Sequence, residues 1–198
     1  NESTMASGSQ ISLIVSGLMR ARALEHWLGT SNLRSFYDGL DGFYGEWNPR
    51  YWEQRAIAAE LSGDWEAAES FAARAATEIP DDKRLTTLGS VLFRRATSDS
   101  SAGDERFGRF VERALSTFEE ARRARPGNPV PILACLSGLL RCGEALRRNG
   151  QALSPRMVSE WNRWLDHGRA ARGATFGPVS RELEGLTTQW LHVALTEI

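Results

Sequence analysis

Histidine and cysteine side chains are the first candidates for metal binding or nucleophilic chemistry in this chain of 198 residues. His26, His167 and His192 are scattered, and none has a second histidine or a cysteine at the spacing of metal ligands. Cys135 and Cys142 share one helical pattern, about 10 Å apart along its axis, whereas a disulfide needs Cα atoms within about 7 Å. We therefore expect no metal site and no disulfide, with both thiols buried in a reduced, cytoplasmic protein.

Other signatures of catalysis are also missing from the sequence. It contains no nucleophile elbow and no Gly-x-x-x-x-Gly-Lys-Ser/Thr phosphate loop. The acidic pairs Glu119-Glu120 and Asp81-Asp82 are typical of solvated helix faces and helix caps. We predict a non-catalytic chain that needs no cofactor, and keep as an alternative a small enzyme whose active site the spacing does not reveal.

Charge is nearly balanced, with 24 basic and 25 acidic residues and a formal net charge of −1. This balance argues against a strongly basic, phosphate-driven binder. The basic residues are nearly all arginines, and three groups of them fall near expected helix C-termini, where they meet the negative end of the helix dipole. Nucleic-acid binding would require these groups to converge in space, so a nucleic-acid-binding helical-repeat regulator is the alternative function. The groups are Arg122-Arg123-Arg125, Arg147-Arg148 and Arg169 with Arg172.

Helical periodicity dominates the chain, and nothing in it is typical of a β-strand. We predict an all-α fold with a single domain over residues 10–198, after a disordered or vector-derived tail at residues 1–9. No apolar run reaches the 18 residues of a membrane span. We expect the chain to be a piece of a longer protein. The expected helices cover residues 10–28, 49–61, 65–78, 82–96, 104–125, 129–148, 155–171 and 178–197.

Prolines at helix ends and small residues at fixed distances from them recur along the chain. An Asn-Pro pair opens two of the expected helices, with asparagine as N-cap and proline in the first turn. Pro80 and Pro126 each close a helix, and an alanine precedes each of them by twelve residues and another by five. Small residues at these positions let two antiparallel helices approach closely. The pattern therefore predicts helical hairpins.

At these residues the chain resembles the tetratricopeptide repeat (TPR), a helix–turn–helix unit of 34 residues. Trp52 stands where the family has its first-helix tryptophan, Gly63-Asp64-Trp65 resembles the family's turn, and Ala68, Ala75 and Pro80 match its second helix and exit. The resemblance covers residues 49–146 and departs from the family at Arg55, where a leucine is usual. It implies antiparallel helical hairpins stacked as a TPR-like α-solenoid, with extra terminal helices.

In TPR arrays the first helix of each unit lines a concave groove that binds peptides or partner helices. The resemblance therefore implies a partner-binding groove. The asparagine pair that clamps carboxyl termini in some members is absent, so ligands of that class are not expected, and the mixed polar and basic groove instead indicates a polar or acidic protein segment. The chain is accordingly expected to be a protein–protein interaction or sensing module. The residues of this chain that stand at the groove positions of the repeat are Arg50, Glu53, Ile57, Glu60, Lys83, Thr86, Ser90, Arg94, Leu133, Ser137 and Arg141.

Residues 48–56 and 63–68 also resemble, more weakly, helical repeat regions of large bacterial NTPases of the signalling and antiphage-defence type. Since this chain lacks a phosphate loop, the resemblance implies an NTPase portion outside it.

The last expected helix carries a wide apolar face formed by Val179, Leu183, Leu186, Trp190 and Val193 and widened by Leu191 and Leu195. Repeat arrays need a polar outer surface on a terminal helix. We therefore expect this helix either to fold back on the array or to contact another chain, with self-association as one form of that contact.

Overall fold

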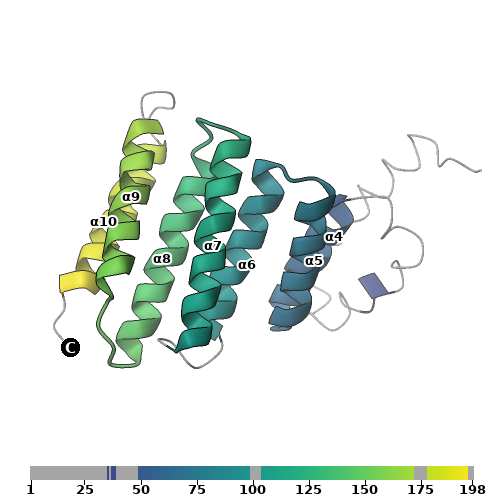
Figure 1. The fold of residues 1–198 in the computed structure, drawn as a ribbon, viewed down its shortest axis with the longest axis horizontal. Helices are drawn as coiled ribbons and strands as arrows, with labels where there is room; N and C mark the ends of the chain where they lie inside the picture. Colours follow the sequence, from purple (N-terminus) through teal and green to yellow (C-terminus); the bar gives the residue numbers. More distant parts are fainter. Residues whose placement is uncertain (1–34, 36, 39–48, 99–103, 172–177, 196–198) are drawn as a thin grey trace, which may run out of the picture. The chain divides into compact units, whose positions relative to one another are not determined.

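The computed structural model describes residues 35, 37, 38, 49–98, 104–171 and 178–195, and within them every regular element is an α-helix. The prediction of an all-α fold is confirmed. The expected helix at 10–28 and the tail at 1–9 lie outside the described residues. The described helices are α4 (Pro49–Leu61), α5 (Trp65–Glu78), α6 (Asp82–Ser98), α7 (Glu105–Ala124), α8 (Val130–Arg148), α9 (Pro155–Ala171) and α10 (Pro178–Leu195) (Figure 1).

Helix ends follow the local signals in the sequence. The side chain of Asp81 accepts the backbone N–H of Arg84 at 2.8 Å before α6, and Asp104 caps α7 by accepting the N–H of Phe107 at 2.7 Å. The turn after α4 needs a left-handed residue, which Gly63 supplies with a φ of 75°. These short-range interactions explain why the observed bounds agree with the expected ones to within about two residues.

Helix α8 begins one residue later than expected, and its cap differs from the predicted Asn-Pro arrangement. Pro129 is the N-cap residue, and its carbonyl oxygen accepts the first helical hydrogen bond, from Leu133. Asn128 lies before the cap. Its side chain accepts the N–H of Val130 at 3.1 Å and donates to Asp82 at the start of α6 at 2.5 Å. Asn128 thereby links the N-terminal ends of α6 and α8 through two hydrogen bonds.

The chain divides into two compact units, Asn1–Phe71 and Ala72–Ile198. The prediction of one domain over residues 10–198 stays a prediction. In the first unit, Trp52 of α4 stacks on Phe71 of α5, with ring centroids 5.7 Å apart. The fully buried Tyr51 packs edge-on against Trp52 and donates a hydrogen bond to the backbone oxygen of Tyr37 at 2.9 Å. Aromatic side chains thus hold the first unit together.

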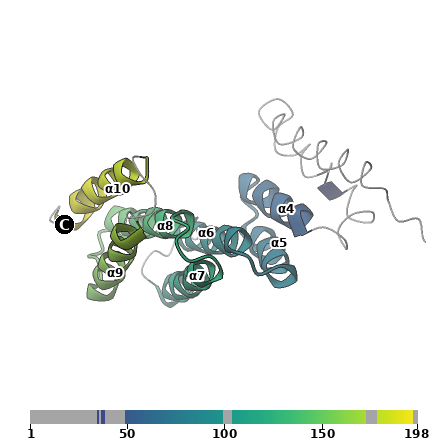
Figure 2. The same cartoon turned by 90° about the horizontal axis from the view of Figure 1, so that it is seen from above.

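In the second unit, α6 packs against α7 and α8, and α8 packs against α7, α9 and α10. Figure 1 shows α6, α8 and α10 running in one direction and α7 and α9 in the opposite direction. Seen from above, α7 and α9 lie on one side of α6 and α8, and α10 lies on the other side of α8 (Figure 2). Helix α8 is therefore central to this unit.

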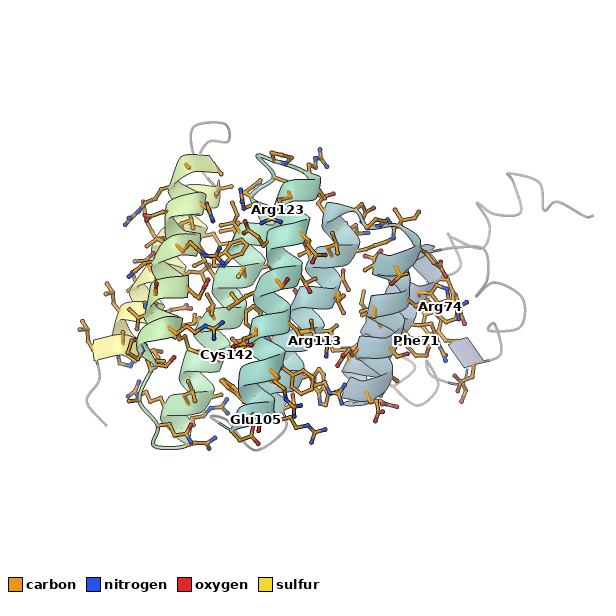
Figure 3. The ribbon with its side chains drawn as sticks, in the orientation of Figure 1. Phe71, Arg74, Glu105, Arg113, Arg123 and Cys142 are labelled. Atoms are coloured by element: carbon orange, nitrogen blue, oxygen red, sulfur yellow. The ribbon has the colours of Figure 1, made fainter. Side chains whose placement is uncertain are left out.

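The core of the second unit surrounds α8. Cys135, Leu136, Leu139 and Cys142 of this helix are all fully buried. Both cysteines are free, which confirms the expectation of two buried thiols without a disulfide (Cys142 is labelled in Figure 3). The interior is built mainly from aliphatic and aromatic side chains, whose burial favours folding at about 25 cal/mol per Å².

Glycines allow the helices of the second unit to approach closely. A Cβ atom on Gly138 of α8 would lie 2.1 Å from the Phe93 ring of α6, and one on Gly89 of α6 would lie 2.7 Å from the Phe118 ring of α7. The two rings stack on each other with centroids 5.6 Å apart. Each glycine therefore provides the space into which a phenylalanine of the neighbouring helix fits.

Helix α10 packs back on the unit through one face. Leu183, Trp190 and Val193 are buried in the shared core, and the indole of Trp190 stacks on that of Trp161 in α9 with centroids 4.3 Å apart. Leu191 and Leu195, which widen the apolar face in the sequence, are 49% and 75% exposed. One face of α10 thus folds back as expected, and another stays open to solvent.

Candidate functional site

The predicted groove residues of the first unit, which the sequence places on α4, do not form an open surface. Glu53 is only 4% exposed; the assignment of this residue to a solvent-lined groove is therefore wrong, because its side chain lies within the packing of the unit. Ile57 and Glu60 are half-buried, and the side chain of Arg50 lies outside the described side chains.

Arg55, which departs from the family pattern, takes part in the aromatic packing of the first unit. Its guanidinium carbon lies 4.6 Å from the centroid of the Phe71 ring, and it donates to the carboxylate of Asp38 at 2.7 Å. A small cavity of about 60 Å³ adjoins it, lined also by residues such as Ser62 and Asp64. The arginine therefore packs its planar head against an aromatic ring of the unit while its charge is paired with a carboxylate.

In the second unit the predicted residues of α6 form one stripe. Thr86, Ser90 and Arg94 are half-buried and Lys83 is exposed, opposite the buried face of Leu85, Gly89, Leu92 and Ala96. Thr86 donates its hydroxyl to the backbone oxygen of Asp82, one turn earlier in the helix, at 2.6 Å.

The predicted residues of α8 form a second stripe, in which Leu133 and Ser137 are half-buried and Arg141 is exposed. The two stripes belong to helices in direct contact, because the Phe93 ring fits over Gly138. Arg94 and Ser137 are the immediate chain neighbours of these two residues. These seven predicted residues thus lie on the solvent-facing stripes of two packed helices, which we call together the α6–α8 face: Lys83, Thr86, Ser90, Arg94, Leu133, Ser137 and Arg141.

The α6–α8 face combines three cations with four neutral side chains. Lys83 lies near the start of α6, whereas Arg94 and Arg141 both lie in the second halves of helices that run in the same direction (Figure 1). The two arginines therefore sit toward the same end of the face. An acidic side chain of a partner could meet either of them there, and the serine and threonine side chains could provide hydrogen bonds.

A second polar site, which the sequence did not indicate, joins α7 and α9. Glu119 is paired with Arg122 at 2.6 Å within α7 and approaches Arg163 of α9 at 3.9 Å, and its side chain is 16% exposed. The interpretation of Glu119 as part of a solvated helix face is therefore wrong, because α9 covers it. Glu112 and Arg156 add a second bridge between the helices, at 2.5 Å. A cleft of about 290 Å³ lies among these side chains.

The charges of this cluster shift the pKa values of two of its members. The hydrogen bond from Arg122 lowers the pKa of Glu119 below its ordinary value, and the nearby charges of Arg122 and Arg163 act in the same direction, against the effect of burial. Burial lowers the pKa of His167, and the charge of Arg122 adds to this effect. The cluster therefore favours an ionised glutamate beside a neutral histidine at neutral pH.

Three arginines of the groups proposed as a nucleic-acid surface pair with carboxylates. Arg122 and Arg123 both approach Glu119, at 2.6 and 3.8 Å, and Arg169 pairs with Asp166 in its own helix at 3.2 Å. Arg123 lies near the C-terminal end of α7 (Figure 3), and Arg172 falls outside the described residues. These pairings reduce the positive potential that phosphate binding requires.

No three His, Cys, Asp or Glu side chains among the described residues are grouped so that they could hold a metal ion. Of the helices that the structure describes, none combines the length and the apolar character that crossing a membrane requires.

Comparison of the chain with protein-family models, with curated proteins and with solved structures finds no match.

Proposed function

We propose that this chain is a non-catalytic protein-interaction or sensing module, and that its α6–α8 face binds a polar or acidic segment of a partner protein. The observation that carries the proposal is the composition of this face: three cations and four neutral side chains across two packed helices, with the exposed Glu144 of α8 as the carboxylate beside them. An acidic segment complements such a surface, and charge complementarity governs both the choice of partner and the rate of association.

We further propose that the helices form a TPR-like α-solenoid. Support comes from the parallel course of α6, α8 and α10 and from the packing of α8 against both of the others. Ala114 and Ala121, which the family pattern places at close helix contacts, are both fully buried. In such an array the parallel helices line the binding surface, which is where the α6–α8 face lies.

The part that this module plays in a larger protein rests on sequence alone. Residues 48–56 and 63–68 resemble the helical repeats of large bacterial signalling and antiphage-defence NTPases, so we propose the repeat portion of a cytoplasmic bacterial protein of that kind. The α6–α8 face would then receive a partner segment and report its binding to the rest of that protein.

Binding is tested with a fluorescein-labelled peptide of alternating glutamate and serine, followed by fluorescence anisotropy, with an alternating glutamine and serine peptide as the neutral comparison. The double variant Arg94→Glu/Arg141→Glu should weaken binding of the acidic peptide about tenfold, because each reversal removes an ion pair worth up to about 1 kcal/mol and sets a carboxylate against the acidic peptide. The matched control is Arg106→Glu/Arg109→Glu on α7, which makes the same charge change on two exposed arginines and should bind like the unaltered chain.

Two outcomes would contradict the proposed surface. One is equal binding of the acidic and neutral peptides; the other is equal weakening by both double variants, which would indicate only a general effect of net charge. A labelled DNA duplex in the same assay distinguishes the alternative, because phosphate binding falls steeply with salt. Tight, salt-sensitive DNA binding that the α6–α8 variant leaves unchanged would favour a nucleic-acid-binding regulator.

A further inference from the structure

Helix α10 presents a second stripe of residues that its packing against the core does not use. Arg181, Glu184, Thr188, Leu191 and Leu195 are all exposed and follow one another at alternating intervals of three and four residues. This is the spacing at which helices pair along their length. Leu195, at 75%, is the most exposed large hydrophobic side chain among the described residues.

The N-terminal half of this stripe borders a hollow between α9 and α10. The hollow has a volume of about 260 Å³ and is lined by Leu165, Arg169, Leu183, Glu184, Thr187 and Thr188. Thr187 and Thr188 donate their hydroxyls to carbonyl oxygens of their own helix, at 2.7 and 2.9 Å. Because these hydroxyls are bonded internally, the two threonines can present their methyl groups to the hollow, beside the two leucines.

The same helix therefore carries protruding leucines at one end and, at the other, a hollow lined by two leucines and two threonines besides Arg169 and Glu184. We propose that two copies of the chain pair through α10 in antiparallel orientation, so that Leu191 and Leu195 of each copy enter the α9–α10 hollow of the other. A two-fold axis near residues 189 and 190 satisfies both contacts at once, as an isologous interface requires. Parallel pairing would instead place leucines against leucines and leave both hollows empty.

Charge and backbone geometry favour the same pairing. In the antiparallel arrangement, Thr188 lies level with the partner's Leu191 and Glu184 lies level with the partner's Leu195, within about one turn of the partner's His192. A parallel arrangement would set Glu184 against its own copy, where like charges repel. Gly185 lies next to the stripe, and a Cβ atom there would meet nothing within 4 Å, so the second helix can approach closely. Antiparallel helix dipoles also attract each other.

Sedimentation equilibrium of the full chain tests the proposal over a hundredfold concentration range, up to about 0.5 mM. The apparent mass should rise from 22.0 kDa to twice that value. Leu191→Glu/Leu195→Glu removes the protruding leucines, and Thr188→Trp fills the hollow; each variant alone should stay at the monomer mass. Val130→Glu on α8, which alters a side chain that is 55% exposed, is the matched control and should dimerise like the unaltered chain.

A mixture of the two monomeric variants distinguishes this antiparallel dimer from nonspecific association. The variant without leucines keeps an open hollow and the variant with a filled hollow keeps its leucines, so one of the two contacts can form. The mixture should therefore show a heterodimer that neither variant forms with itself, at a concentration above that needed by the unaltered chain.

Three results would overturn the proposal. They are a constant 22.0 kDa mass for the unaltered chain, dimerisation of the Leu191→Glu/Leu195→Glu variant, and a mixture that stays monomeric. Far-ultraviolet circular dichroism of each variant confirms that it is folded, and Leu195→Glu alone serves as the milder variant if the double variant loses helicity. This inference is independent of partner binding at the α6–α8 face, and either can fail without the other.

Discussion

Substituting Gly138 by alanine should destabilise the protein although alanine is the better helix former. The added Cβ atom would lie 2.1 Å from Cδ2 of Phe93 and 2.6 Å from its Cε2 atom, whereas carbon atoms in contact prefer about 3.5–4.0 Å. The Phe93 ring would have to move by more than an ångström. It is 1% exposed and stacked on Phe118, whose own ring is packed over Gly89 and against Trp164. These packed aromatic rings therefore leave the Phe93 ring little space to move.

The expected loss follows from two opposing effects. Overpacking of a tight core costs about 1–3 kcal/mol, and the blocked ring places this site near the upper end of that range. Replacing glycine by alanine in a helix contributes about 1 kcal/mol in the other direction. We therefore expect a net loss of about 2 kcal/mol in the free energy of unfolding, or about 4–8 °C in Tm for a protein of this size.

The assay is urea unfolding followed by far-ultraviolet circular dichroism, with Gly108→Ala as the matched control. Gly108 also lies within a helix, but a Cβ atom there would meet nothing within 4 Å. This variant should gain up to about 1 kcal/mol. The double variant Phe93→Leu/Gly138→Ala should lose less than the sum of the two single variants, with a coupling of at least about 1 kcal/mol.

A Gly138→Ala variant as stable as Gly108→Ala would refute this reasoning. It would mean that α6 and α8 do not meet through Phe93 and Gly138. Additive losses in the double variant would lead to the same conclusion. Since the α6–α8 face depends on this contact, the proposed binding surface would lose its structural basis as well.

Two further predictions concern titrating groups. Burial raises the pKa of the Cys142 thiol to about 12 and raises that of Cys135 well above its usual range. A thiol reagent at neutral pH should therefore label neither cysteine until urea unfolds the chain. Rapid labelling of the folded protein would contradict the packing around α8. For His167, burial lowers the pKa in the folded state, so the unfolded chain binds more protons at pH values between that pKa and about 6.5. Stability should fall as the pH drops through this window, and His167→Gln should remove that part of the pH dependence; an NMR titration midpoint of His167 at or above about 6.5 would count against it.

Sequence reasoning succeeded where the determining interactions are local. Helix bounds depend on caps such as Asp81 and Asp104 and on turns such as Gly63, whose partners lie within a few residues. The separate, buried thiols of α8 follow from helical periodicity in the same way.

The features that sequence reasoning missed depend on which helices become neighbours. Glu119 looks like a solvent-facing residue until Arg163, from a different helix, is brought to 3.9 Å. The glycines at 89 and 138 weaken a helix by local criteria, and only the rings of neighbouring helices explain them. The position of Glu53 in the repeat pattern predicted that this residue lines an open groove. That position does not show which side chains pack over the helix, and Glu53 is buried.

The central place of α8 has a consequence for how the second unit folds. In a linear repeat array, terminal hairpins can open one at a time, because each contacts only its neighbours. Here α8 shares its buried side chains with α6 and α7 on one hand and with α9 and α10 on the other. Unfolding either pair exposes apolar surface of the same helix. Backbone amides in the middle of α8 should accordingly exchange their hydrogens only when residues 72–198 unfold as one cooperative block.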